Sequence, residues 1–389
     1  MDTHSADTPI PHHVAQLHRR MLVGVVVLGL LCVAAVVWLW PESRPELTEP
    51  PNEVIPGVVV TVQERSEPVD PAFGVSGRFL VIDVELTEGF SQGQIVTVEV
   101  PVEGFPSVTP GDRVTVESMM TPDGFEYYIT DFQRIPVLLI LALLFIVAVL
   151  AVSRWHGVRS LIGLGVSLGI VIWFIVPSIL DGRPPALVAL VGSVAIMIVT
   201  LYFTHGVKPM TTAAVLGTTG ALALTVTIGT VFIASAKITG FSSDDAVFAR
   251  FASDGMLDLQ GLVLAGLIIA ALGVLDDVTI AQSSTVFALH NADPTLTFRS
   301  LFARAMVVGR DHIASVVNTL FLAYAGASLA LLVLFSTGGL PASEVLNSEI
   351  IATEIVKTIV GSLGLVLAVP FTTALAATVV RAQPRTAAR

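Results

Sequence analysis

Residues 272–279 read LGVLDDVT and residues 308–315 read VGRDHIAS, and these two stretches decide how we interpret the chain. Each lies within or beside a long apolar segment, and a short polar connection separates the two segments. A charged side chain at the centre of a membrane helix costs about 2.5–3.5 kcal/mol even on a mild insertion scale. Two groups of ionisable residues in such places therefore predict one shared polar site at one level of a bilayer.

The composition of the whole chain indicates a membrane protein. Of its 389 residues, 53% are hydrophobic and 13% are charged. Runs of about 20 apolar residues recur, each long enough to cross a bilayer core of about 30 Å. The single cysteine, Cys32, excludes a disulfide framework and a cysteine-based metal site. Residues 41–134 hold 17 acidic and 5 basic residues, a charge of −12, whereas the net charge of the whole chain is −11. The acidic residues are therefore concentrated in one insert, and their charge argues against nucleic acid as a partner.

The N-terminal third of the chain predicts a tail, one helix and a β-domain. Residues 1–20 are polar and form a cytoplasmic tail, and residues 21–40 form an uncleaved transmembrane helix, longer than the apolar core of a signal peptide. Residues 41–134 then alternate β-branched residues with Gly, Pro and Asp, as short strands and turns do. We expect an OB-like barrel or a sandwich outside the cytoplasm. Its five strands are predicted at Val58–Gln63, Arg78–Leu86, Gln94–Val100, Arg113–Glu117 and Phe125–Asp131.

Residues 135–381 predict a domain of seven further transmembrane helices. The fold class is therefore a polytopic α-helical membrane protein with about eight transmembrane helices and the β-domain between the first two. Lysine and arginine concentrate in cytoplasmic loops. With eight spans the basic loops all fall on one side, which places both termini, including the tail 382–389, in the cytoplasm. The seven apolar segments are 136–152, 158–180, 186–204, 210–236, 257–280, 311–335 and 350–380.

The candidate binding residues lie on the sixth and seventh predicted spans. On the seventh span, Asp311, Ser315 and Asn318 share one helical stripe at 100° per residue. On the sixth span, Asp276 lies near the cytoplasmic boundary, which is where the seventh span begins, so the two groups can meet. The complete set is Asp276, Asp277, Arg310, Asp311, His312, Ser315, Asn318 and Thr319.

The residue types at this site favour a proton or a divalent cation as its ligand. Adjacent carboxylates repel each other unless a proton, a cation or an arginine neutralises one of them. Oxygen ligands suit hard divalent cations, and a histidine leaves room for a softer metal. The candidate metal ligands are Asp276, Asp277, Asp311 and His312. In the alternative interpretation the acids lie in headgroup water and Arg310 anchors to lipid phosphate, and no ligand spacing here is diagnostic of a metal.

A second polar feature lies on the fifth predicted span. Thr211, Thr218 and Thr225 recur every seven residues, so Thr218 and Thr225 are candidates to line a solute pathway. The alternative is helix packing, with each hydroxyl bonded to a backbone carbonyl of its own helix. Gly266 and Gly273 on the sixth span predict a face that another helix approaches closely.

The motifs resemble one known family. The stretches 272–279 and 308–315, with Asn318-Thr319-Leu320 and Ala323–Ala327, resemble the YibE/F-like family of bacterial integral membrane proteins. The similarity covers most of the chain after residue 135. The resemblance implies a bacterial cytoplasmic membrane as the location and the same layout of helix, β-domain and multi-span region. It implies no activity, so function has to be argued from the site.

Three functional hypotheses remain open. The first is a transport protein whose polar site binds a coupling proton, a cation or a cationic group of a small solute. The second is a membrane accessory or assembly protein whose β-domain binds a partner. The third, an intramembrane enzyme, is disfavoured because Gly273 to Asp276 do not match the Gly-x-Gly-Asp pattern of aspartyl proteases, and Ile280 and Ala281 break the diphosphate–metal pattern Asp-Asp-x-x-Asp. The expected partners are the lipid bilayer and a small solute or ion. The glycine- and alanine-rich spans also permit a homo-oligomer.

Overall fold

The computed structural model describes residues 12–42, 53–70, 75–89, 91–121, 124–253, 255–339 and 341–381. The chain divides into two compact units, one of which is Glu46–Arg154 and the other Met1–Pro45 together with Trp155–Arg389. Of the two predicted tails, residues 1–11 and the whole of 382–389 lie outside the described residues. The first helix begins at His12, nine residues before the predicted Met21.

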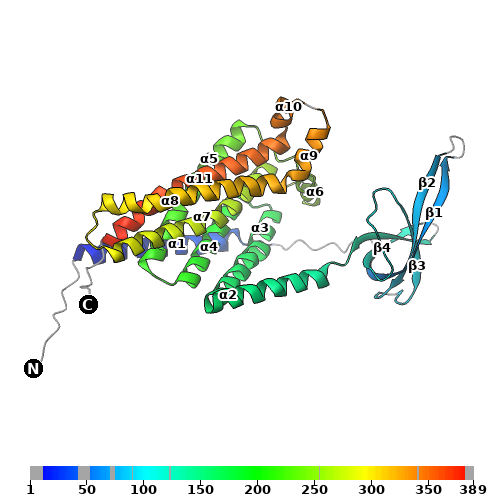
Figure 1. The fold of residues 1–389 in the computed structure, drawn as a ribbon, viewed down its shortest axis with the longest axis horizontal. Helices are drawn as coiled ribbons and strands as arrows, with labels where there is room; N and C mark the ends of the chain where they lie inside the picture. The colour runs from blue at the N-terminus through cyan, green and yellow to red at the C-terminus, as the bar shows by residue number, and fades with distance from the viewer. Residues whose placement is uncertain are drawn as a thin grey trace, which may run out of the picture. The chain divides into compact units, whose positions relative to one another are not determined.

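The first unit contains a five-stranded antiparallel sheet with the strand order β3-β2-β1-β4-β5 (Figure 1). Side chains alternate between the two faces of a strand, so in β3 Val96 and Val98 are buried while Ile95 and Thr97 are exposed. The buried face holds Ile, Val and Leu side chains from four of the strands. All five predicted strands are present. Their bounds are β1 (Glu53–Asp70), β2 (Val75–Leu86), β3 (Ile95–Pro101), β4 (Arg113–Thr121) and β5 (Gly124–Phe132).

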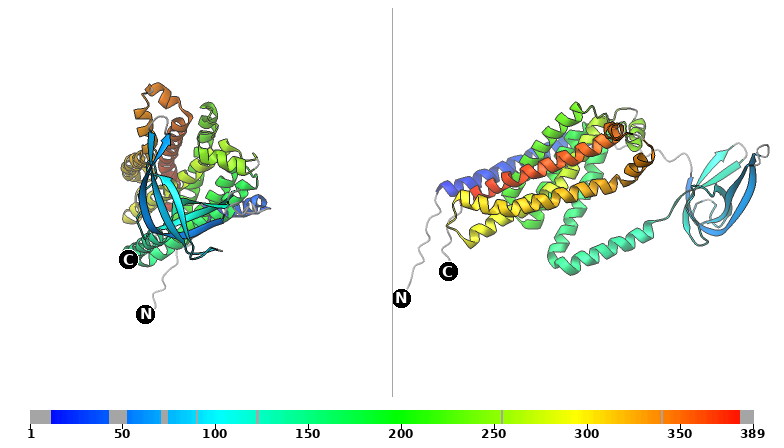
Figure 2. Two further views of the ribbon diagram at one scale, coloured as in Figure 1. Left: turned by 90° about the vertical axis from the view of Figure 1, so that its right-hand side faces the viewer. Right: turned by 45° about the horizontal axis from the view of Figure 1, so that its top comes forward.

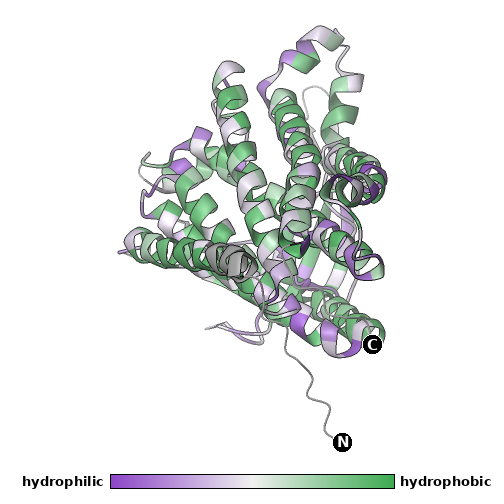
Figure 3. Cartoon of the chain, turned by 90° about the vertical axis from the view of Figure 1, so that its left-hand side faces the viewer, coloured by the Kyte–Doolittle hydropathy of each residue, from purple (hydrophilic) through white to green (hydrophobic). Residues whose placement is uncertain are grey.

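Most of the rest of the described chain is helical, and the long helices of the second unit form a bundle (Figures 1 and 2). Hydrophobic residues predominate along the long helices (Figure 3), as a membrane-spanning bundle requires. The helices are α1 (His12–Leu39), α2 (Ile135–Ile170), the π-helical turn η1 (Val171–Ile175), α3 (Val176–Leu180), α4 (Pro185–His205), α5 (Pro209–Ser235), α6 (Asp244–Ala252), α7 (Leu259–Ala292), α8 (Phe298–Ala327), α9 (Leu329–Thr337), α10 (Ala342–Asn347) and α11 (Glu349–Arg381).

The helices α5, α7 and α11 form the centre of the bundle and make the most extensive helix–helix contacts. Glycines let them approach closely, because a Cβ on Gly217 would overlap the hydroxyl of Thr372 and a Cβ on Gly229 would overlap Leu267. Close approach through small residues is the usual way in which membrane helices pack. The predicted close approach at Gly266 and Gly273 is wrong, since a Cβ at either position would meet nothing within 4 Å.

The described residues contain fewer candidate spans than the eight predicted, because one long apolar stretch counts as a single span. Among the described residues, six helices are long and apolar enough to cross a membrane, or seven if the bent pair α8–α9 counts as one span. The stretch Ile135–Leu180 counts as one of these, although two spans were predicted in it. Its backbone is not continuously helical, because Arg154 has φ 48° and ψ −125° and kinks α2 between the two predicted segments. The axes of α8 and α9 differ by 60° across Ser328.

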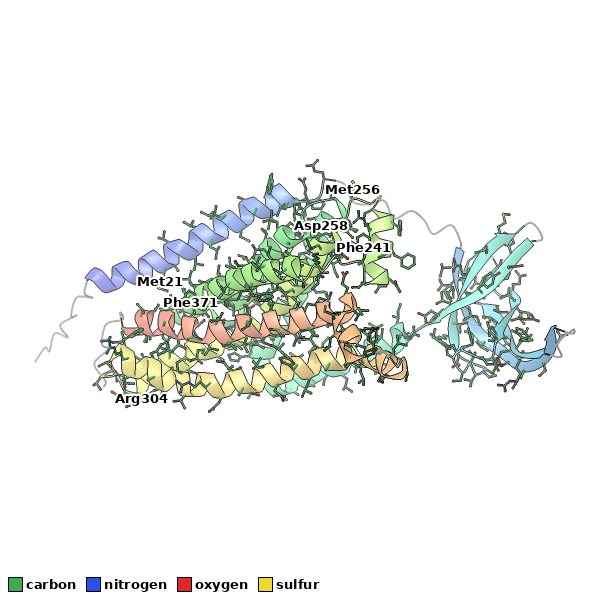
Figure 4. All side chains as sticks on the ribbon, turned by 90° about the horizontal axis from the view of Figure 1, so that it is seen from above. Met21, Phe241, Met256, Asp258, Arg304 and Phe371 are labelled. Carbon is green, nitrogen blue, oxygen red and sulfur yellow. The ribbon has the colours of Figure 1, made fainter. Side chains whose placement is uncertain are left out.

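The two ends of the bundle carry different residues. Met21 and Arg304 lie at one end, while Phe241 and Asp258 lie at the other (Figure 4). At the second end Asp258 caps α7 by accepting a hydrogen bond from the backbone N–H of Gly261 at 3.0 Å. Glu349, the first residue of α11, accepts hydrogen bonds from the N–H groups of Thr239 and Gly240 at 2.8 and 2.7 Å. The hydrogen bonds of Glu349 hold the loop between α5 and α6 against the start of α11.

Candidate functional site

The two aspartates of α7 line a cavity of about 550 Å³ between α2, α4 and α7, which we call the aspartate pocket. Asp276 lies about 25 Å along α7 at 1.5 Å per residue, close to the middle of this long helix. Gly273, one turn earlier, lines the same cavity, and its missing side chain leaves the space open. The polar residues of the pocket are Ser160, Ser167, Thr200, Thr204, His205, Asp276 and Asp277.

The Asp276 carboxylate is half-buried, and its surroundings leave it incompletely paired. Its Oδ1 atom is buried and has no hydrogen-bond partner among the described residues. The adjacent Asp277 is exposed. A buried carboxylate oxygen without a partner is costly in a membrane-embedded site. The arrangement therefore favours a proton, a cation or a ligand donor at this oxygen.

Two hydroxyl groups of the pocket, those of Ser167 and Thr200, are available as hydrogen-bond acceptors. Ser167 donates to the carbonyl of Gly163 at 2.9 Å, and Thr200 donates to the carbonyl of Ile196 at 2.7 Å. Because each hydroxyl proton is used within its own helix, the oxygen lone pairs remain free to accept. Together with two carboxylates, these oxygens suit a positively charged or proton-donating guest.

The pocket also contains His205, which the sequence analysis did not select. It lies in the last turn of α4 and lines the pocket together with Asp276 and Asp277. A histidine titrates near neutral pH and can exchange protons with a neighbouring carboxylate. The sequence places His205 at the predicted cytoplasmic end of a span, which is the membrane level also predicted for Asp276, and this shared level could have identified it.

The polar group on α8 does not join the aspartates. None of its members lines the aspartate pocket. Instead α8 packs on α7 and α11 through apolar side chains, among them Met306, Ile313 and Val317. His312 is partly buried, while the other predicted residues are exposed: Arg310, Asp311, Ser315, Asn318 and Thr319. The predicted meeting of the two groups is therefore not seen in the described part of the chain.

The predicted metal ligands are likewise not brought together. Among the residues that the structure describes, no group of three or more His, Cys, Asp or Glu is arranged to hold a metal ion. Of the four candidates, Asp276 and Asp277 line the pocket, while Asp311 and His312 lie on α8 outside it.

The polar connection between α7 and α8 is made by Gln282, which the sequence analysis also missed. This side chain is 3% exposed. Its amide donates to the carbonyl of Ala305 at 3.1 Å and to the hydroxyl of Thr373 at 2.7 Å. Gln282 thus ties α7, α8 and α11 together, and its neighbour on α8 is Gly309, where a Cβ would crowd it.

The two candidate threonines of α5 are buried between packed helices. Thr218 and Thr225 donate to the carbonyls of Ala214 and Ala221 at 3.1 and 2.9 Å, as the packing alternative expects. The hydroxyl oxygen of Thr218 also lies 2.6 Å from that of Thr279 on α7. Both residues are fully buried, and neither lines the aspartate pocket. Their geometry agrees with helix packing.

Comparison with known proteins gives one result. Residues 141–382 match the family model described as YibE/F-like protein, which spans α2 to the end of α11. No curated protein matches the chain. No solved structure matches it either.

Proposed function

The chain belongs to the YibE/F-like family, and from this premise we propose that it is a membrane transport protein that binds a coupling proton or cation at Asp276 and Asp277. The observation that carries the proposal is the buried, unpartnered Oδ1 of Asp276 in a cavity lined by acceptor oxygens. An uncompensated carboxylate in a membrane protein is expensive and is by default a functional candidate. A reversible proton or cation would remove that cost.

The neighbouring residues suggest how the site loads and unloads. Asp277 is exposed and Asp276 is half-buried, so Asp277 meets the guest first and Asp276 holds it. His205 supplies a second titratable group at the end of α4, beside the cation of Lys208. Two neighbouring carboxylates repel each other when both are charged. Binding of a proton or cation at one aspartate therefore changes the affinity of the other.

Ion flux through proteoliposomes tests this function. The purified chain is reconstituted, a potassium gradient with valinomycin sets the potential, and internal pH and the uptake of labelled cations are followed. We expect flux above that of empty liposomes, and a loss of at least tenfold in Asp276→Asn. Asp311→Asn is the matched control because it removes an acid that lies outside the pocket. Equal flux in both variants would contradict the proposal.

We propose the following topology for the chain. It has eight transmembrane helices in a bacterial cytoplasmic membrane, with α2 divided at Arg154 into two spans, both termini in the cytoplasm and the β-domain outside as an OB-like barrel. The separation of Arg304 from Asp258 at opposite ends of the bundle supports the orientation (Figure 4). Labelling single cysteines in intact cells tests it: Ser300→Cys should be protected, and Thr97→Cys should react with a membrane-impermeant maleimide.

One observation favours a second candidate function, that of an accessory protein. On the hairpin β4–β5, Met120 and Phe125 form a cross-strand pair, and both are exposed, at 79% and 62%. An apolar pair on an exposed hairpin is a feature of partner-binding surfaces. Under this hypothesis Met120→Ser with Phe125→Ser would abolish capture of a partner and leave the bundle intact. The same variant would leave ion flux unchanged if the chain transports alone.

A further inference from the structure

A second cavity, of about 650 Å³, lies where α8 breaks, and we call it the break pocket. Its walls come from the loop before α6, the first turns of α6 and α7, the junction of α8 and α9, and the first turns of α11. This volume is that of a small organic ligand and far exceeds what a bare ion needs.

The break pocket is acidic. Asp244 and Asp245 lie on one side and Glu354 on the other, against the single base Lys357. Glu354 accepts a hydrogen bond from Lys357 at 2.9 Å, so the two aspartates remain uncompensated within the pocket. Two more acidic than basic side chains favour a positively charged guest.

The break in the helix adds a second source of negative potential. α8 ends at Ala327, and Ala327 and Ser328 line the pocket. The carbonyl of Tyr324 accepts from the N–H of Ser328 at 3.0 Å, and the carbonyls of the last turn together form the negative end of the helix dipole. Broken helices whose carbonyls face a cavity are a recurrent way for membrane proteins to hold cations.

One buried polar group in the wall lacks a partner. Thr353 is 6% exposed, lines the pocket, and its hydroxyl has no hydrogen bond to any residue that the structure describes. A buried hydroxyl without a partner is costly, and a donor placed in the pocket would satisfy it. This observation is independent of the acidic cluster and points to the same pocket.

Contacts between the loop before α6 and the neighbouring helices hold the walls of the pocket in place. Gly240 has φ 83° and lies so close to the carbonyl of Leu259 that a side chain would clash. The Glu349 carboxylate clamps the N–H groups of Thr239 and Gly240, and Arg250 covers the Phe241 ring at 5.2 Å. The loop before α6 is thus fixed to both α7 and α11.

We propose that the break pocket binds the ammonium group of an organic amine. An ammonium offers three N–H donors, which match a carboxylate, the Thr353 hydroxyl and a carbonyl at the end of α8. The organic part has apolar neighbours in Leu262, Val263 and Leu331. An apolar groove along Phe321 and Tyr324 adjoins the pocket and shares Glu354 with it. The amine is a free solute or the headgroup of a lipid whose chains follow this groove.

The proposal does not depend on the transport function. A binding experiment on the purified full chain tests it, in nanodiscs of phosphatidylglycerol, with 2-phenylethylammonium as the probe and 2-phenylethanol as its uncharged analogue. We expect saturable binding of the ammonium and none of the alcohol. The Asp276→Asn protein should bind the ammonium normally, so a failed aspartate pocket and a failed break pocket can be told apart.

Variants identify the groups that hold the ammonium. Asp244→Asn combined with Asp245→Asn should weaken binding about tenfold or more, because it removes the two carboxylates that the pocket leaves without a pairing base. Thr353→Val keeps the shape of the side chain and should weaken binding about threefold to tenfold with no loss of thermal stability. Glu344→Gln is the matched control, since Glu344 is an exposed acid outside the pocket, and it should bind as the unchanged protein does.

The lipid arm separates the two sources of the amine. Nanodiscs that contain phosphatidylethanolamine should compete with the probe if the natural guest is a headgroup, and should leave its affinity unchanged if the guest is a free amine. Either result agrees with an ammonium site. Absence of saturable ammonium binding in both lipids would overturn the proposal. Equal affinity in the double aspartate variant, Thr353→Val and the unchanged protein would overturn it as well.

Discussion

Gly364 on α11 lies directly against the hydroxyl of Thr225 on α5, so closely that a Cβ at position 364 would overlap that oxygen. Thr225 is fully buried and donates its proton to the carbonyl of Ala221 on its own helix. The hydroxyl therefore serves as a small, internally satisfied surface on which α11 packs. This contact belongs to the central group α5, α7 and α11, which supports the helix that carries the two aspartates.

Gly364→Ala should destabilise the bundle by about 1–3 kcal/mol, the usual cost of overpacking a tight contact. Gly361→Ala is the matched control on the same helix, because a Cβ there meets nothing within 4 Å. Without a clash, replacing a helical glycine by alanine should be neutral or stabilise by about 0.5–1 kcal/mol. Unfolding in mixed detergent micelles measures both. Equal stabilities would mean that this seam is not tightly packed.

Gly273→Leu should block the aspartate pocket and leave the fold intact. Position 273 lines the pocket, and a Cβ there meets nothing within 4 Å, so the new side chain enters empty space beside Asp276. Ion flux in proteoliposomes should fall severalfold while the unfolding temperature stays within a few degrees. Gly266→Leu, equally free of contacts but outside the pocket, is the control and should retain flux. Similar losses in both variants would contradict the assignment.

The β-domain should lose stability in acid through Asp83. Its carboxylate accepts hydrogen bonds from Thr61 at 2.6 Å and Thr97 at 2.8 Å, on the two neighbouring strands, and these bonds hold the pKa of Asp83 below its usual value. A pKa that is lower in the folded than in the unfolded state gives stability above the unfolded pKa, and that stability is lost as pH falls through the folded pKa.

Hydrogen exchange of β2 measures this effect. After correction for intrinsic exchange rates, protection of residues 78–86 should fall on acidification in the unchanged protein. Asp83→Asn should remove that part of the pH dependence, whereas Glu85→Gln, an exposed acid two residues away, should preserve it. A pH profile that Asp83→Asn leaves unaltered would show that the two threonines do not stabilise the carboxylate.

Local patterns predicted the elements of this fold well. The alternation of β-branched and polar residues predicted all five strands. Successive side chains of a strand point to opposite faces, so a strand with one buried face has a hydrophobic residue at every second position. The length of the apolar runs gave the helices. The break between residues 152 and 158 was also anticipated, although the sequence did not indicate that Arg154 would adopt a positive φ.

The partners of each helical face could not be predicted in the same way. A helical wheel places Asp311 and Asn318 on one stripe, but it does not say whether that stripe faces α7 or the outside of the bundle. Only one apolar face of α8, which includes Met306 and Ile313, packs on α7 and α11, and Asp311 lies outside that face and is exposed. The residues that line the pocket with Asp276 come from α2 and α4, about 70 to 116 residues earlier in the chain. Only the tertiary fold brings one of them, His205, close to Asp276.

The central claim is that Asp276 takes up and releases a proton or cation inside the aspartate pocket. Infrared spectroscopy tests it most directly, by following the carboxyl C=O stretch while the buffer is stepped across the range in which carboxyl groups and histidine titrate. We predict a protonation-dependent carboxyl band, shifted by cations that compete for the site, which is absent from Asp276→Asn and present in Asp311→Asn. A band that persists unchanged in Asp276→Asn would contradict the account.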